Sequence, residues 1–163
     1  RQVGVGALRF SLLKSEARRA IDFRWDLALS LQGDSAPYIQ YAHARACSIL
    51  RAGSKVGLDI GLADWNQIGS LEVKLAQVLA RLPRVGKVAA RDLAPHLVAQ
   101  YALDLAAAWN SYYNHKGLDG KSDTQVIRAA PGLREARYGL VERVSCSLKS
   151  SLFFLGIEAP ERM

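Results

Sequence analysis

A tyrosine and an arginine spaced one helical turn apart are the residues of this sequence best placed to bind a ligand. Tyr41 and Arg45 belong to the run 35–50, Ser-Ala-Pro-Tyr-Ile-Gln-Tyr-Ala-His-Ala-Arg-Ala-Cys-Ser-Ile-Leu. At about 100° per residue they share one flank of a helix with Ser48, and Tyr38 lies at its boundary. A ring one turn from a guanidinium can hold an unstacked nucleobase. The competing interpretation makes the tyrosines core residues and the arginine a solvated edge.

The helix that must position these side chains carries its own start signals. Asp34 or Ser35 can cap it, and Pro37 suits its first turn. The pattern predicts that the helix ends near Gly53. Its apolar face consists of Ile39, Ala42, Ala46, Ile49 and Leu50.

Helical periodicity runs through nearly all of the remaining chain, and no stretch has the alternation of a strand. A Gly-punctuated loop over 53–64 and a polar turn from Lys116 to Asp123 separate the periodic stretches. We expect helices over about 3–20, just after 23–26, over 68–82 with Pro83 as the stop, over 85–92, from Pro95 to Tyr112, and from Pro131 to Leu155, ended by Gly156. The sequence therefore predicts an all-α fold, a helical bundle of about six to seven helices.

Two of these helices carry long apolar stripes that predict the centre of the core. The first stripe is Val98, Tyr101, Leu105, Ala108, Trp109 and Tyr112. The second is Leu133, Ala136, Leu140, Val144, Leu148, Leu152 and Leu155.

The composition is that of one globular domain with a net positive charge. The 163 residues are 50% hydrophobic, and 22 Lys and Arg against 15 Asp and Glu give a net charge of +7. This balance favours a polyanionic partner such as nucleic acid. Cys47 and Cys146 lie in apolar helical patterns, which predicts core or near-core thiols in a reducing cytoplasm. Because Arg1 leads directly into an apolar pattern, we expect a piece of a larger protein, and no membrane span is predicted.

The chemistry of an enzyme is not visible in the sequence. His43, His96 and His115 have no carboxylate or cysteine at metal-ligand spacing. Gly4-Val5-Gly6 is too short for a dinucleotide fingerprint, and Gly53-Ser54-Lys55 lacks the upstream glycine of a phosphate loop. His43 faces away from Tyr41 on the helical wheel. These residues predict a binding module without metal or catalytic residues.

Four stretches, in order along the chain, resemble the C-terminal part of arginyl-tRNA synthetases, the all-helical DALR anticodon-binding domain. They are Gly-Val-Gly-Ala-Leu-Arg-Phe at 4–10, Phe-Arg-Trp-Asp-Leu-Ala-Leu-Ser at 23–30, Pro-Tyr-Ile-Gln-Tyr-Ala-His-Ala-Arg at 37–45, and Leu-Gly-Ile-Glu-Ala-Pro-Glu-Arg-Met at 155–163. The third run and the Pro-Glu-Arg-Met ending are specific to this synthetase. Arg24 departs from the acidic residue that the family usually has there.

The resemblance implies a class I synthetase whose catalytic half lies outside this sequence, because neither a His-Ile-Gly-His-like nor a Lys-Met-Ser-Lys-like motif is present. Residues 1–20 then form a connecting helix that follows the catalytic domain, and residues 21–163 form the DALR-type domain. The fragment itself needs no cofactor, and ATP with Mg is implied for the catalytic domain. The implied partners are that catalytic domain and the anticodon arm of arginine tRNA, without membrane or DNA, in a cytoplasmic monomer.

The resemblance also implies which residues contact the tRNA. They are the loop 30–35, with Gln32, Gly33, Asp34 and Ser35, then Tyr38, Tyr41 and Met163, and less directly the aromatic-Asn stretch Tyr112, Tyr113 and Asn114. Arg45 joins them from its place beside Tyr41. Two alternatives stay open, a helical protein-docking module and the DALR domain of another class I synthetase.

Overall fold

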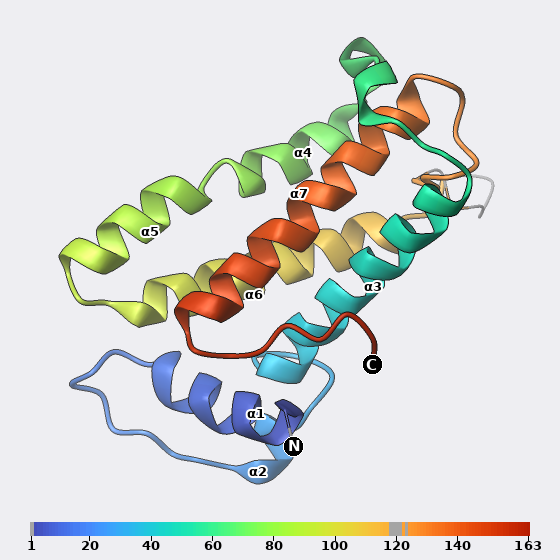
Figure 1. Ribbon diagram of the computed structural model, residues 1–163. Coiled ribbons are helices and arrows are strands. Elements are labelled where there is room, and N and C mark those ends of the chain that lie inside the picture. The colour runs from blue at the N-terminus through green and yellow to red at the C-terminus, as the bar shows by residue number, and fades with distance from the viewer. Residues whose placement is uncertain (1, 118–121, 123) are drawn as a thin grey trace.

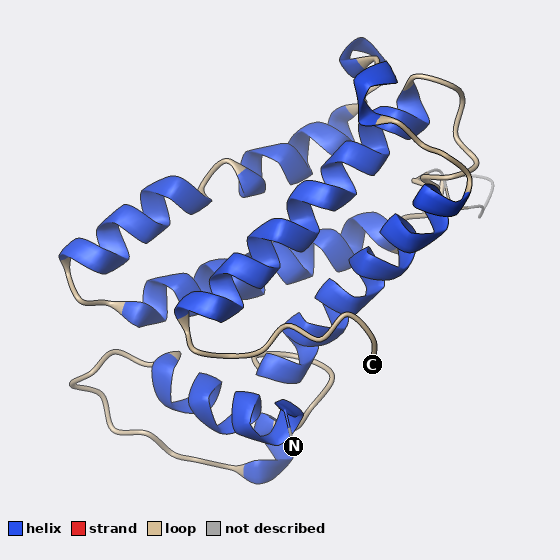
Figure 2. Ribbon diagram, in the orientation of Figure 1, coloured by secondary structure: helices blue, strands red, loops and turns tan. Residues whose placement is uncertain are grey.

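The computed structural model describes residues 2–117, 122 and 124–163, which form helices joined by turns and loops (Figure 1), with no strand in this part of the chain (Figure 2). The helices are α1 (Gln2–Leu13), α2 (Trp25–Ala28), α3 (Ala36–Lys55), η1 (Ile60–Leu62), η2 (Trp65–Gln67), α4 (Ser70–Leu79), α5 (Leu82–Arg91), α6 (Pro95–Tyr113) and α7 (Leu133–Phe154). The predicted all-α bundle of six to seven helices is confirmed, with seven α-helices among the described residues, of which α2 is a single turn.

The core lies between the three longest helices, α3, α6 and α7. Helix α7 packs along both α3 and α6, and Figure 1 shows α4 and α5 alongside α6 and α7 on the side away from α3. The two predicted stripes point into this core: Trp109 and Leu148 are fully buried, and only Ala108 and Leu133 are half-buried. Burial of these apolar side chains is the main source of stability of such a bundle.

A buried carboxylate joins three of the helices. Glu72 of α4 accepts hydrogen bonds from Tyr112 of α6 at 2.9 Å and from Nε of Arg137 of α7 at 2.8 Å. Burial alone would raise the pKa of Glu72. The hydrogen bonds from Tyr112 and from the Gly69 backbone N–H, together with the Arg137 charge, outweigh burial and lower the pKa. The carboxylate is therefore ionised and fully partnered, which fixes α4 against the core.

The proline at position 83 begins a helix, and the prediction that it ends one was wrong. Helix α4 ends at Leu79, and Pro83 lies in the first turn of α5, which starts at Leu82. In a first turn the missing proline N–H has no intrahelical acceptor to lose. The apolar spacing across 75–82 is continuous in sequence although the helix is not.

The first helix is shorter than the predicted 3–20. It ends at Leu13, and residues 16–20 are exposed and irregular because the run Glu-Ala-Arg-Arg-Ala has no apolar face to bury. The predicted loop 53–64 contains instead the last turn of α3 and the turn η1. Asp59 caps η1, and Asp64 caps η2 beyond it.

Only one of the two cysteines is in the core. Cys47 is buried, whereas Cys146 is exposed on α7 and the prediction for it was wrong. Cys146 lies two residues after Val144, a rotation of about 200° on the helix, which turns it away from the buried stripe.

Arg24 forms an exposed ion pair with Asp26 at 2.6 Å. Of the predicted turn from Lys116 to Asp123, residues 118–121 and 123 lie outside the described residues. No helix in the described part of the chain is long and apolar enough to cross a bilayer.

Candidate nucleic-acid interface

The helix that carries the tyrosines, α3, has a capped N-terminus. Ser35 is the N-cap of α3, and its hydroxyl accepts the Tyr38 backbone N–H at 3.2 Å and donates to the Ser30 carbonyl. In the preceding loop the Ser30 hydroxyl donates to the Gln32 carbonyl at 2.7 Å, and Lys14 holds the Asp34 carbonyl at 3.0 Å. The loop 30–35 therefore has a defined shape while Gln32, Gly33 and Asp34 remain exposed.

The Arg45 guanidinium lies against two tyrosine rings from different helices. Its carbon is 4.7 Å from the ring centroid of Tyr41 on α3 and 4.5 Å from that of Tyr113 at the end of α6. Arg45 also donates to the Tyr41 hydroxyl at 2.9 Å. The rings are 38% and 42% exposed. The predicted Tyr41–Arg45 flank is thus outside the core, and the fold adds Tyr113 to it; we call these three residues the aromatic–guanidinium cluster.

Two further α6 residues support this cluster, and neither was predicted from the sequence to belong to a site. Asn110 accepts a long hydrogen bond, 3.4 Å, from Arg45, and the fully buried Trp109 packs its ring 5.9 Å from that of Tyr113. Their spacing of three and four residues from Tyr113 was the available signal, but it could not show that this end of α6 meets α3. Among the described residues Arg45 forms no ion pair, so its charge is available to an anion.

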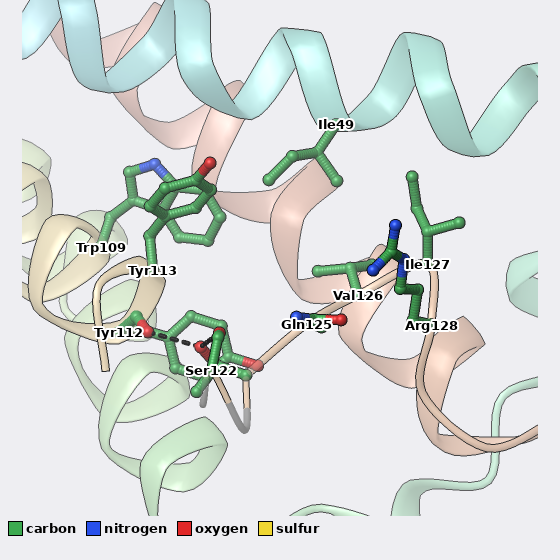
Figure 3. Close-up of a pocket in the computed structure, with 10 residues that line it drawn as sticks. Ile49, Trp109, Tyr112, Tyr113, Ser122, Gln125, Val126, Ile127 and Arg128 are labelled. Atoms are coloured by element: carbon green, nitrogen blue, oxygen red, sulfur yellow. Dashed lines mark hydrogen bonds between the residues drawn. The ribbon is translucent and has the colours of Figure 1, made fainter. Parts of the chain in front are cut away.

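A pocket of about 350 Å³ opens beside the cluster. Figure 3 shows Trp109, Tyr112 and Tyr113 of α6 on one side, residues 125–128 on the other, and Ile49 of α3 above. Its walls are mostly apolar, and its lining includes the polar residues Ser122, Thr124, Gln125 and Arg128. The described part of the 115–130 segment therefore builds one wall of a cavity next to Tyr113.

The C-terminal end of the chain is held against α3 by hydrogen bonds. Gly156, with φ of +67°, ends α7, and the next residue, Ile157, is buried and donates to the Leu152 carbonyl at 2.8 Å. Beyond it, the carbonyl of Glu158 accepts from Gln40 at 2.8 Å and that of Pro160 from His43 at 3.0 Å. Figure 1 shows the C-terminus beside α3.

His43 is a buried structural residue. Because the Pro160 carbonyl can only accept, the proton lies on Nδ1, which leaves Nε2 as the acceptor 3.5 Å from the Cys47 sulfur. Burial, together with the Lys149 charge, lowers the pKa of His43 despite the Pro160 hydrogen bond. The imidazole is neutral at pH 7 and is directed away from the aromatic–guanidinium cluster.

The other expected site residues differ in their exposure. Tyr38 is half-buried against the core one turn before Tyr41. Asn114 is the exposed C-cap of α6, and Tyr112 belongs to the core. Met163 is 52% exposed. No group of three or more His, Cys, Asp and Glu in the described part of the chain could hold a metal ion.

Comparisons with known proteins show which family this chain belongs to. Residues 39–163 match the family described as the DALR anticodon binding domain. The chain is 47% identical to an arginine–tRNA ligase of Deinococcus radiodurans and 41% identical to one of Pyrococcus furiosus, in each case over 100% of its length but only 27% and 26% of theirs. A solved Thermus thermophilus arginyl-tRNA synthetase superposes with a TM-score of 0.93 at 47% identity, over 99% of this chain and 27% of that one.

The chain thus spans about a quarter of the length of these relatives. The family match covers α3 almost from its start, the whole of α6 and α7, and the tail to Met163. These are the elements that carry the aromatic–guanidinium cluster and the tied-down chain end. The protein belongs to the DALR anticodon binding domain family.

Proposed function

We propose that this chain is the tRNA-recognition part of an arginine–tRNA ligase and that it binds the anticodon arm of arginine tRNA. The observation that carries the proposal is the Arg45 guanidinium, unpaired by any carboxylate among the described residues, against the half-exposed rings of Tyr41 and Tyr113. A base from a single-stranded loop can stack on such rings, and the guanidinium can pair with a base edge or a phosphate.

The remaining contacts are proposed around this stack. The loop residues Gln32, Gly33 and Asp34 are exposed and held in one shape, which suits contacts to the RNA backbone. Asn114 and Tyr38 flank the aromatic–guanidinium cluster along the chain, and Ser35 acts by shaping the loop. The pocket beside Tyr113 gives space for a neighbouring nucleotide.

The whole protein would use this part to orient its tRNA. Support comes from the relatives, which are named arginine–tRNA ligases and are about four times as long. In this proposal residues 1–20 connect to a preceding catalytic domain, which takes arginine and ATP with Mg, and residues 21–163 form the tRNA-binding domain. The protein would act as a monomer in the cytoplasm, where tRNA is charged.

A binding titration tests the proposal. Affinity of the chain for an arginine tRNA and for one non-cognate tRNA is measured at two or more salt concentrations. We expect tighter binding of the arginine tRNA and a steep loss with salt, with a slope of about 0.7–0.9 per phosphate contact. Equal binding of both tRNAs would point to the DALR domain of another synthetase. Absence of tRNA binding would favour a protein-docking module, whose hydrophobic contacts depend little on salt.

A further inference from the structure

We propose that Gln40, His43 and Arg51 of α3 form a clamp on the C-terminal tail and that this tail clamp positions Met163 for the tRNA. The inference rests on the proposed function and extends it to residues that do not touch the RNA. It gives a role to Gln40 and His43, two buried polar residues of α3 that belong neither to the apolar core nor to the aromatic–guanidinium cluster.

Each of the three side chains donates a hydrogen bond to a backbone carbonyl of the tail. Gln40 holds the carbonyl of Glu158 at 2.8 Å, His43 that of Pro160 at 3.0 Å, and Arg51 that of Glu161 at 3.0 Å. Backbone carbonyls are bound whatever the tail's side chains are, so the contacts fix the path of the chain. Arg51 reaches back along α3 from about two turns beyond His43.

The positions of the donors show which way the tail runs. Gln40 comes first along α3 and bonds the earlier tail residue, so the tail runs in the direction of α3, toward the level of Arg45. The donors lie at about 80–160° of rotation from Tyr41 and about 120–160° from Arg45, so they face the side of α3 that adjoins the Tyr41 flank and is away from Arg45. Met163, two residues past Glu161, therefore ends beside α3, across its exposed Tyr41 flank from Arg45 (Figure 1).

The burial of the donors separates this arrangement from an accidental surface contact. Gln40 is 0% exposed and His43 is 1% exposed, so each would lose a buried hydrogen bond if the tail left. The last residues of a domain normally fray, because nothing opposes their conformational entropy. Here Ile157 anchors the start of the tail in the core and the clamp holds the next four residues.

A matched pair of substitutions at His43 isolates the clamp. In His43→Asn the amide nitrogen takes the place of Nδ1 and can still donate to the Pro160 carbonyl. In His43→Gln the amide extends toward the place of Nε2 and cannot. Both variants remove the buried ring beside Cys47, so they share the packing loss, which thermal melts will quantify. They differ in the tail contact, which only His43→Asn can keep, and in the polar contact to the Cys47 sulfur, which only His43→Gln can keep.

The readouts are the mobility of Met163 and the affinity for arginine tRNA. Met163 is the only methionine in the sequence, so a ¹³C-methyl label on methionine reports on the tail end alone. We expect a sharpened, solvent-like methyl signal for His43→Gln and a parental signal for His43→Asn. Loss of one hydrogen bond of ordinary strength predicts about fivefold weaker tRNA binding for His43→Gln than for His43→Asn.

Deletion of Met163 completes the test as a double-mutant cycle. If the clamp acts through Met163, the deletion weakens binding in the parent and adds nothing in His43→Gln. Additive losses, or two His43 variants with the same methyl signal and the same affinity, would overturn the proposal. A parent chain that binds no arginine tRNA would instead refute the proposed function, and the methyl signal would then overturn or support the clamp by itself.

Discussion

At the scale of single residues, the Tyr41–Arg45–Tyr113 contacts are strong enough to pre-arrange a site and weak enough to open. A cation–π contact at an exposed position is worth about 0.5–1 kcal/mol. The stacking of a base on an aromatic ring is worth about 1–3 kcal/mol. An incoming base can therefore displace or share the guanidinium at a net gain, while the Arg45–Tyr41 hydrogen bond keeps the ring oriented in the free protein.

Replacement of Tyr41 separates stacking from packing. We expect Tyr41→Ala to weaken binding of arginine tRNA by about 1–3 kcal/mol, the contribution of one base–aromatic stack. Tyr41→Phe keeps the ring and loses only the hydroxyl that accepts from Arg45, so it should retain most of the affinity. The measurement is a tRNA titration at fixed salt with thermal melts as the control. A variant Tyr41→Ala that unfolds, but binds normally in its folded fraction, would show that the ring is structural.

Whether a contact of the site could be predicted from the sequence depends on how far apart its two residues are along the chain. Tyr41 and Arg45 are four residues apart, so a helical wheel suffices to pair them, as it does to turn His43 away. The resemblance implies a tRNA contact for Tyr113, but its place beside Arg45 could not be predicted, because that contact depends on how α6 packs against α3. The bond from His43 to Pro160 spans 117 residues and has no local signal at all.

At the scale of elements, the contact between α3 and α7 depends on a glycine. A Cβ built on Gly53 would lie 2.3 Å from the ring of Tyr138, far inside any real contact. The same tyrosine donates to the Leu50 carbonyl at 3.0 Å, so its ring cannot move aside without losing that bond. Gly53, buried within α3, therefore permits close approach of the two helices.

Two Gly→Ala substitutions in helices should have opposite effects. Gly53→Ala should destabilise the fold by about 1–3 kcal/mol, the usual cost of overpacking a close contact. Gly86→Ala on α5 meets nothing within 4 Å, so it should stabilise by about 0.4–1 kcal/mol through the lower entropy of the unfolded chain. Chemical denaturation measures both. Equal effects of the two substitutions would contradict the tight α3–α7 contact.

The elements that could be predicted are those in which one periodic signal persists. Helices α6 and α7 each present an uninterrupted apolar stripe with a proline before it, and their predicted spans were accurate. The break between α4 and α5 was misread because Pro83 can end one helix or begin the next, and only the position of the core decides. The end of α1 at Leu13 was missed for a similar reason, since good helix formers continue after the apolar face stops.

At the scale of the whole molecule, exposed apolar side chains recur among the first thirty-one residues. Trp25, Leu27 and Leu31 are each more than half exposed, and Val5, Leu8 and Leu12 of α1 are more than 40% exposed. Apolar surface of this kind marks a contact with another protein surface. It agrees with the proposal that residues 1–20 lead out of a preceding domain, against which this end of the bundle would pack.

The same proposal predicts that the chain alone has no synthetase chemistry. It spans about a quarter of the related ligases and carries neither of the two motifs that handle ATP in class I enzymes. We expect no arginine-dependent pyrophosphate exchange and no aminoacylation, while the same preparation still binds arginine tRNA in a salt-dependent manner. The measurement needs protein free of host synthetase, which is checked with a parallel preparation of Tyr41→Ala that should bind tRNA more weakly and leave any contaminating exchange unchanged. Exchange that persists after rigorous purification, at a level proportional to this chain, would mean that an ATP site lies within these 163 residues and that the division into recognition and catalytic parts is wrong.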